Sequence, residues 1–248
     1  MNLRFIYTDT SNGFYNMAVD EALFLKYNKL TSIPATIRFY TFSPPAITIG
    51  RFQALDDLDI ESLGIPIVRR LTGGRAILHN GDLAYSLITQ EDNPLFGGLA
   101  VNGYKSMGSI FKEALNILGV NATLVRLTHS QYQKNSVCFN SISRYELQVG
   151  GKKIFGSAQF RKAGIILQQG SLLLNSMSLS GYPTWGQVGL NQILCREINI
   201  HEVISTVKLT LINMGITLME DSLAETEKSL VNKLVTKYMS TAPALSYE

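Results

Sequence analysis

Strand-like segments joined by short turns are the feature that most restricts the folds open to this chain. Residues 145–149 alternate apolar and polar side chains, with the period of a half-buried strand. Gly150 and Gly151 follow at once and predict a two-residue hairpin turn. Further strand-like runs lie at residues 3–8, 35–42, 45–51, 65–70, 76–79, 82–90 and onward from 152 to about 174, and residues 76–79 and 82–90 are expected to form a hairpin. Such short connections favour a largely antiparallel or mixed sheet.

Hydrophobic periodicity predicts helices that flank this sheet. From Asn12 to about Lys29, apolar residues recur at helical spacing and predict one buried face, made by Phe14, Met17, Ala18, Ala22 and Leu25. Similar patterns predict helices over about 104–118, after Asn199, and around 230–238, and residues 56–63 favour a short one. Asn199 is a candidate N-cap, with Glu202 three residues later as in a capping box. We therefore expect a single α+β (α/β) domain over residues 1–248.

Composition excludes several classes of function. Hydrophobic residues make up 46% of the chain, enough for an extensive core. The net charge is only +3 and no basic stripe concentrates it, so we expect no nucleic-acid partner. No apolar run reaches bilayer length and no signal peptide precedes the first strand, so we expect a cytoplasmic protein without a membrane partner. Cys138 and Cys195 form no paired motif, which excludes a disulfide scaffold, and Cys195 is expected to be structural.

Residues 69–79 form the first segment whose residues could bind a ligand or take part in catalysis. Paired glycines let a backbone approach a ligand closely, and the arginines around them favour an anionic or strongly polar group. A hairpin turn with solvated arginines is an equal alternative on spacing alone. The candidate residues here are Arg69, Arg70, Thr72, Gly73, Gly74, Arg75 and His79.

Residues 151–159 form the second segment. Lys153 follows a tight turn, and next along the strand come Gly156, Ser157 and Ala158. A lysine above small residues can act as a fixed cation that holds an acyl carbonyl or a phosphate, or depresses the pKa of a nearby thiol. An ordinary edge-strand charge is the simpler alternative.

Cys138 is the third candidate. A lone cysteine is most often a small buried hydrophobe. This one follows a polar stretch and precedes the hairpin that carries Lys153. A loop cysteine near a lysine is the arrangement that favours a reactive thiolate.

Together these segments resemble one known superfamily. Residues 69–79 are similar to the Arg-Arg-x-(Thr/Ser)-Gly-Gly-x-Ala-x-x-His motif of the lipoate–protein ligases and octanoyltransferases, and residues 151–158 to their Gly-x-Lys-x-x-Gly-Ser-Ala motif. Residues 16–22 and 50–53 also agree. The resemblance implies the fold shared with biotin ligases, in which a mixed, largely antiparallel central sheet is flanked by helices and a smaller sheet closes the cleft.

Within the superfamily, the chain most resembles the cysteine-dependent octanoyl-[acyl-carrier-protein]:protein N-octanoyltransferases. Cys138-Phe139, the strand that begins at Tyr145, and Arg75 after the paired glycines look like that group. The resemblance implies an octanoyl-acyl carrier protein as donor, a lipoyl-domain protein such as the glycine-cleavage H protein as acceptor, no cofactor and a monomer. Cys138 and Lys153 would be catalytic, and the other motif residues would bind substrate.

The sequence is also compatible with two other functions. An ATP-dependent lipoate–protein ligase on the same fold would use Lys153 on an acyl-adenylate, with ATP and magnesium. A non-catalytic module that binds lipoyl domains is the third. The chain also departs from the group's usual pattern, since Gln169 replaces a histidine, and Asn80 and Asn140 replace aspartates.

Overall fold

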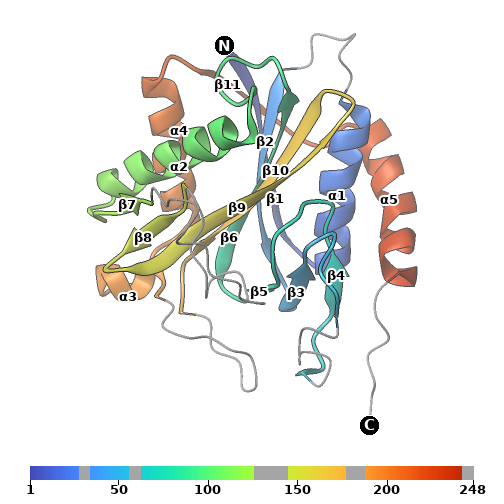
Figure 1. The fold of residues 1–248 in the computed structure, drawn as a ribbon, viewed down its shortest axis with the longest axis horizontal. Helices are drawn as coiled ribbons and strands as arrows, with labels where there is room; N and C mark the ends of the chain where they lie inside the picture. Colours follow the sequence, from blue (N-terminus) through green and yellow to red (C-terminus); the bar gives the residue numbers. More distant parts are fainter. Residues whose placement is uncertain (28–33, 56–62, 126–144, 177–187, 242–248) are drawn as a thin grey trace.

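Two β-sheets form the framework of the protein (Figure 1). The computed structural model describes residues 1–27, 34–55, 63–125, 145–176 and 188–241. Within these ranges the larger sheet has eight strands in the order β11-β1-β2-β6-β10-β9-β8-β7. Their bounds are β1 Asn2–Ser11, β2 Ala35–Phe42, β6 Asp82–Gln90, β7 Thr123–Leu124, β8 Leu147–Val149, β9 Lys152–Lys162, β10 Ile165–Leu173 and β11 Thr217–Asp221.

The smaller sheet has the order β4-β3-β5 among the described residues. Its strands are β3 Ala46–Ile49, β4 Ile67–Arg69 and β5 Ile77–His79. In the larger sheet β1 runs parallel to β2 and β11, whereas every pairing from β2 to β7 is antiparallel. The expected mixed, largely antiparallel sheet with a smaller second sheet is therefore confirmed.

Helices cover both faces of the larger sheet (Figure 1). Helix α1 (Gly13–Lys26) packs beside α5 (Glu225–Ser240) on one face, and α2 (Ala100–Ile117) beside α4 (Ile200–Asn213) on the other. A short helix, α3 (Leu190–Leu194), lies on the second of these faces. Each face has its own apolar core, since large hydrophobic clusters form against α2 and α4 and against α1 and α5. None of the described helices combines the length and the hydropathy that a bilayer-spanning segment requires.

The expected hairpin of residues 76–79 and 82–90 is wrong. β5 pairs with β3 of the smaller sheet, whereas β6 pairs with β2 and β10 of the larger one. Gly81, with a φ of 88°, lies where the chain passes from one sheet to the other. This crossing brings the motif of residues 69–79 against the face of the larger sheet.

Two smaller expectations also need correction. Leu25 is 55% exposed, because the buried face of α1 continues through Leu23 and Phe24 instead. Glu202 does not complete a capping box: its carboxylate accepts a hydrogen bond from Arg196 at 3.0 Å. Cys195, which was expected to be structural, is exposed at the end of α3. The expected helix at 56–63 falls largely outside the described residues.

Candidate active site

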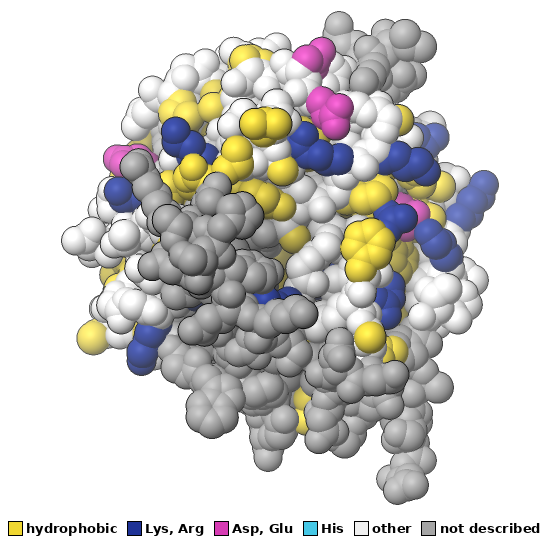
Figure 2. Space-filling view, in the orientation of Figure 1, with side chains coloured by type: hydrophobic (Ala, Val, Ile, Leu, Met, Phe, Trp, Pro, Cys, Tyr) yellow, Lys and Arg dark blue, Asp and Glu magenta, His cyan; other side chains and the backbone are white. Residues whose placement is uncertain are grey.

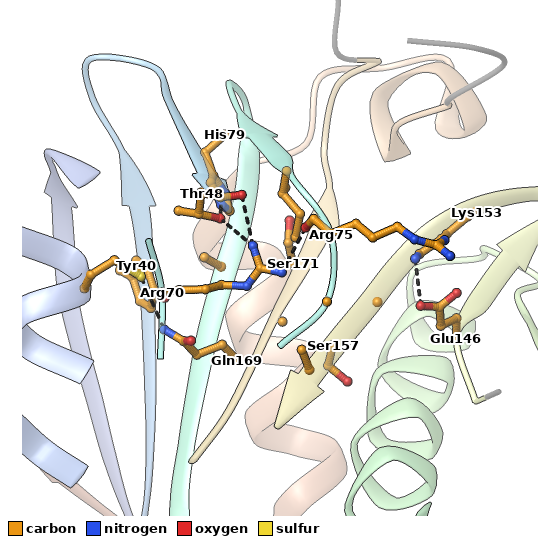
Figure 3. A pocket seen from close by; sticks show the side chains of 17 residues that line it. Tyr40, Thr48, Arg70, Arg75, His79, Glu146, Lys153, Ser157, Gln169 and Ser171 are labelled. Atoms are coloured by element: carbon orange, nitrogen blue, oxygen red, sulfur yellow. Dashed lines mark hydrogen bonds and ion pairs between the residues drawn. The ribbon is translucent and has the colours of Figure 1, made fainter. Parts of the chain in front are cut away.

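A cavity lies between the smaller sheet and the face of the larger sheet that carries α1 (Figure 3). It encloses about 650 Å³ together with the solvent space at its mouth. In Figure 3, Lys153 and Glu146 lie at one end and Tyr40 and Gln169 at the other, with Arg70 between them. The lining residues are Met17, Tyr40, Thr48, Arg70, Gly74, Arg75, Ile77, His79, Ala84, Glu146, Lys153, Gly156, Ser157, Ala158, Gln169, Gly170 and Ser171.

Small side chains form the floor of the cavity because strand register aligns them. Gly156 on β9 pairs with Ser171 on β10, Ser171 pairs with Ala84 on β6, and Ala84 pairs with Tyr40 on β2. Neighbouring strands lie about 4.8 Å apart, so this row spans about 14 Å from Gly156 to Tyr40. The floor is therefore a narrow track that crosses four strands and ends against a tyrosine ring.

A β-bulge turns Lys153 toward the cavity. Leu147 pairs with Phe155 and Gln148 with Lys153, so one step along β8 matches two steps along β9. Ile154 is the extra residue, and it is fully buried in the core together with Phe155. Bulges of this kind re-aim side chains beside active sites. Lys153 consequently lies on the same face as Gly156, which strict alternation of a regular strand from Phe155 would not allow.

Lys153 is held in a buried ion pair. Its Nζ lies 2.7 Å from Glu146 Oε1, and the two side chains are only 1% and 7% exposed. A carboxylate at this distance offsets much of the cost of burying an ammonium group. A Cβ atom on Gly156 would lie 2.7 Å from Lys153 Cε and 2.9 Å from its Nζ, so the lysine needs glycine at that position.

Arg70 shapes the loop of residues 72–75 from within. Its guanidinium donates to the carbonyls of Gly73 at 2.7 Å and Arg75 at 2.9 Å, and to the Thr48 carbonyl at 2.9 Å. Gly74 has a φ of +89°, a conformation in which glycine avoids strain. In Figure 3, the Arg75 side chain extends from this loop toward the Lys153 end of the cavity. The buried Arg70 is thus a brace for the loop, with its charge spread over carbonyl oxygens.

Three predicted site residues do not line the cavity. The Arg69 guanidinium instead binds the turn after β3, where it donates to the carbonyls of Gly50 at 2.9 Å and Gln53 at 2.7 Å. Thr72 is fully buried and its hydroxyl donates to the amide oxygen of Gln169 at 2.8 Å. Gly73 contributes the carbonyl that Arg70 binds. These residues support the walls, whereas Arg70, Gly74, Arg75, His79, Lys153, Gly156, Ser157 and Ala158 come together at the cavity.

His79 belongs to a buried hydrogen-bonded chain at the rim. Its Nδ1 lies 2.7 Å from Asp82 Oδ2 and its Nε2 lies 2.9 Å from the Thr48 hydroxyl. The Phe42 ring stacks on the imidazole at 3.9 Å. Ser171 also donates to Asp82. Among the described residues, no group of His, Cys, Asp or Glu side chains is arranged to hold a metal ion.

Tyr40, at one end of the cavity, is a residue that sequence patterns did not single out. Burial, and next the nearby charge of Asp20, raise the pKa of Tyr40 well above its ordinary value, so the phenol stays neutral. It donates to Asp20 at 2.8 Å. Met17 completes this end. The available signal was Asp20, an acidic residue among the apolar positions of the first predicted helix.

The face around the cavity mouth carries basic and apolar side chains. Figure 2 shows Lys and Arg side chains toward the right of this face, with few acidic ones among them, and hydrophobic ones toward its upper part. Arg51 and Phe52 are exposed, Phe52 by 88%. They lie on the turn that contacts the loop of Gly74, because the Arg51 N–H donates to the Thr72 carbonyl at 2.9 Å.

The predicted nucleophile, Cys138, lies outside the described residues, which resume at Tyr145. Its role therefore stays a prediction. Glu146, which contacts Lys153, is the second residue of the described chain after that segment.

Comparisons with known proteins agree with this architecture. The sequence model of the lipoyl protein ligase A/B catalytic domain matches residues 12–211. "Octanoyltransferase LipM" of Brevibacillus brevis is 34% identical over 95% of this chain and 95% of its own length. The protein of the same name from Anoxybacillus flavithermus is 36% identical over 80% of this chain and 81% of its own length. These similarities exceed what a shared fold alone requires.

Solved structures show the same fold. A protein of T. acidophilum described as a lipoate protein ligase, with bound lipoic acid, superposes with a TM-score of 0.79. It is 24% identical and the match covers 97% of each chain. The chain therefore belongs to the lipoyl protein ligase A/B catalytic domain family, and within that family it is an acyltransferase of the octanoyltransferase branch.

Proposed function

We propose that this octanoyltransferase works through a thioester on Cys138, with octanoyl-acyl carrier protein as donor and a lysine of a lipoyl-domain protein as acceptor. The observation that carries the proposal is the buried Lys153–Glu146 pair at one end of a cavity floored by small residues. This geometry provides a fixed cation for the reacting carbonyl and a track for the acyl chain. The similarity to the octanoyltransferases above supports the choice of acyl group.

The reaction needs two acyl transfers. The Cys138 thiolate attacks the thioester carbonyl of the donor, a new S–C bond forms, and the carrier thiol leaves after taking up a proton. The amine of the acceptor lysine then attacks the Cys138 thioester, forms an amide, loses a proton and releases the thiol. The first transfer is nearly neutral in free energy and the second is downhill, so the proposed route requires neither ATP nor magnesium.

Lys153 would act on the negative charge that develops in both steps. A preorganised cation in a site without water stabilises an oxyanion far more than the same cation does in water. Glu146 holds the ammonium group in place at 2.7 Å. The same cation would favour the thiolate form of a cysteine brought close to it.

The acyl chain would lie along the floor from Gly156 toward Tyr40. Ser171 and Ala84 leave room above the strands, and Met17 together with the neutral Tyr40 closes the far end. The basic and apolar surface at the mouth, including Arg51 and Phe52, fits an acidic carrier protein as donor.

Intact-mass spectrometry tests the proposal directly. The protein is incubated with octanoyl-acyl carrier protein without ATP, beside the Cys138→Ala variant. We expect the wild type to gain one octanoyl group that hydroxylamine removes, and the variant to gain none. Addition of a lipoyl domain should then discharge the octanoyl group onto the lysine of that domain.

A different result would overturn the proposal. If no adduct forms, and a lipoyl domain is modified only when lipoate, ATP and magnesium are supplied, the protein acts as a ligase through an adenylate. If an adduct forms equally on Cys138→Ala, another nucleophile carries the acyl group.

A further inference from the structure

Gln169 connects two parts of the structure that lie far apart in the sequence. It lies on β10, is 7% exposed, and lines the Tyr40 end of the cavity. Its Nε2 donates to Asp20 Oδ2 at 2.6 Å, and its Oε1 accepts from the Thr72 hydroxyl at 2.8 Å. Both ends of the carboxamide are thus engaged, one by helix α1 and the other by the glycine loop. The side chain has a fixed orientation as a result.

The Asp20 end of this connection is a rigid anchor. Asp20 is 1% exposed, and its carboxylate also accepts from Arg38 at 2.6 Å, Tyr40 at 2.8 Å and Ser86 at 2.7 Å. These donors come from β2 and β6, so the anchor is fixed to the central sheet. Because Arg38 stays paired without Gln169, removal of the amide does not leave a buried charge uncompensated.

The Thr72 end determines where the glycine loop begins. Thr72 accepts the Arg51 N–H through its carbonyl and donates its hydroxyl to Gln169. Two residues later Gly74 forms part of the cavity wall. Arg70 binds the carbonyls of Gly73 and Arg75, which lie further along the loop. Gln169 therefore links this wall to the floor of the cavity through the Thr72 hydroxyl.

We infer that Gln169 is a positioning residue that ties the loop of residues 72–75 to the Asp20 anchor and so sets the width of the acyl cavity. A carboxamide provides one donor and one acceptor at every pH, whereas an imidazole becomes a donor at both nitrogens once protonated. Gln169 is hydrogen-bonded to Asp20 on α1, Asp20 is hydrogen-bonded to Arg38 and Tyr40 on β2, and Arg70 lines the same cavity. The inference rests on the proposed use of this cavity for the octanoyl chain.

The test replaces Gln169 with methionine, which has a similar length but forms no such hydrogen bonds. In Gln169→Met we expect amide hydrogen exchange of residues 72–75 to become about tenfold faster, the effect of one or two buried hydrogen bonds. We expect KM for octanoyl-acyl carrier protein to rise by about tenfold, with a smaller change in kcat. If Gln169 only contributed to overall stability, its replacement would not speed exchange at residues 72–75 more than elsewhere. It would also not raise KM more than it lowers kcat.

Two further variants connect the effect to Thr72. Thr72→Val should reproduce the exchange and KM of Gln169→Met, and the double variant should be no worse than either single variant, because both remove the same link. Gln169→His should keep KM near the wild-type value at neutral pH and add an acidic limb to the pH profile of kcat/KM that the wild type lacks. This variant also keeps the test valid if Gln169→Met folds poorly.

The matched control is Thr210→Val. The Thr210 hydroxyl is buried on α4, on the opposite face of the sheet, and donates to the Thr206 carbonyl at 2.9 Å. Its loss should lower stability without changing KM or exchange at residues 72–75. Wild-type exchange at residues 72–75 in Gln169→Met would overturn the inference, and so would additive effects in the double variant. A wild-type protein that transfers no octanoyl group would instead overturn the proposed function, while the exchange measurement would still decide the role of Gln169.

Discussion

At the scale of single residues, glycine positions determine how the reacting groups can lie. A Cβ atom on Gly156 would meet the flexible end of Lys153 and the Glu146 carboxylate at 3.1 Å. A Cβ atom on Gly170 would instead meet the Tyr85 ring and the Gly156 carbonyl, at 2.8 Å. Gly156 pairs with Ser171 and Gly170 pairs with Ser157, so the two glycines are diagonal neighbours on β9 and β10. One leaves room for Lys153, the other for the buried Tyr85 ring.

This difference predicts that alanine at Gly156 lowers mainly activity, whereas alanine at Gly170 lowers mainly stability. Gly156→Ala should lower the free energy of unfolding by less than about 1 kcal/mol, because the end of Lys153 can move aside. It should lower the rate of octanoyl transfer by about 10²-fold, the effect of a misplacement of about 1 Å. Gly170→Ala should destabilise the protein by about 1–3 kcal/mol, because a buried ring must shift.

Urea unfolding and a single-turnover transfer assay measure the two quantities. The double variant Gly156→Ala/Lys153→Ala should be no less stable than Lys153→Ala alone, because the clash disappears together with the cation, and it should be inactive. Full activity in Gly156→Ala would contradict the role given to Lys153.

At the scale of elements, the β8–β9 hairpin positions the cation. Gly150 and Gly151 have φ values of 56° and 77°, as a two-residue turn with two left-handed positions requires. Sequence pattern predicts this hairpin correctly. The bulge at Ile154 is not predictable from the sequence pattern. In the run from Lys153 to Gly156, the pattern does not determine which residues point to the same face of the sheet. Only the pairing with β8 decides which side chain faces the cavity.

The turn gives a prediction for the element. Gly151→Val should destabilise the protein by about 1–2 kcal/mol, because a β-branched residue is strained at positive φ. Gly150→Asn should be nearly neutral, since Asn-Gly suits the same turn. Urea denaturation compares the variants, and equal effects of the two substitutions would mean that the turn adopts another conformation in solution.

At the scale of the whole molecule, Arg4 joins the first strand to the last strand and helix. Its guanidinium bonds to Asp221 on β11 at 2.7 Å and to Glu227 on α5 at 2.7 Å. The Ser222 backbone N–H, and then Arg4, hold the pKa of Asp221 below its usual 3.8. A lowered pKa means that Asp221 stabilises the fold above about pH 3.8 and that this contribution is lost as the pH falls below that value.

Thermal unfolding as a function of pH tests this link. Asp221→Asn should lower Tm at pH 7, by an amount within the 1 kcal/mol or so of an exposed ion pair. The difference from the wild type should shrink and vanish as the pH falls below about 3.8. A difference that stays constant down to pH 2 would show that the carboxylate charge is not the cause.

Strand β11 shows what pattern could not reveal. Residues 217–221 are almost entirely exposed and lack the alternation of a half-buried strand. They form a strand because β1 offers a parallel edge. The hairpin expected from residues 76–79 and 82–90 was wrong for a related reason: proximity in sequence favours pairing, but each strand has a better partner in a different sheet.

The sequence by itself determined the helices with strong periodicity, the Gly150-Gly151 turn, the fold class and the branch of the family, because local propensity and contiguous motifs are properties of short segments. Only the tertiary structure decided that Lys153 faces Gly156, that Arg70 braces the glycine loop and that Gln169 joins Thr72 to Asp20. The last contact connects residues separated by 97 and 149 positions. Such contacts depend on sheet order and register, which are set by the packing of the whole chain and not by any short stretch of it.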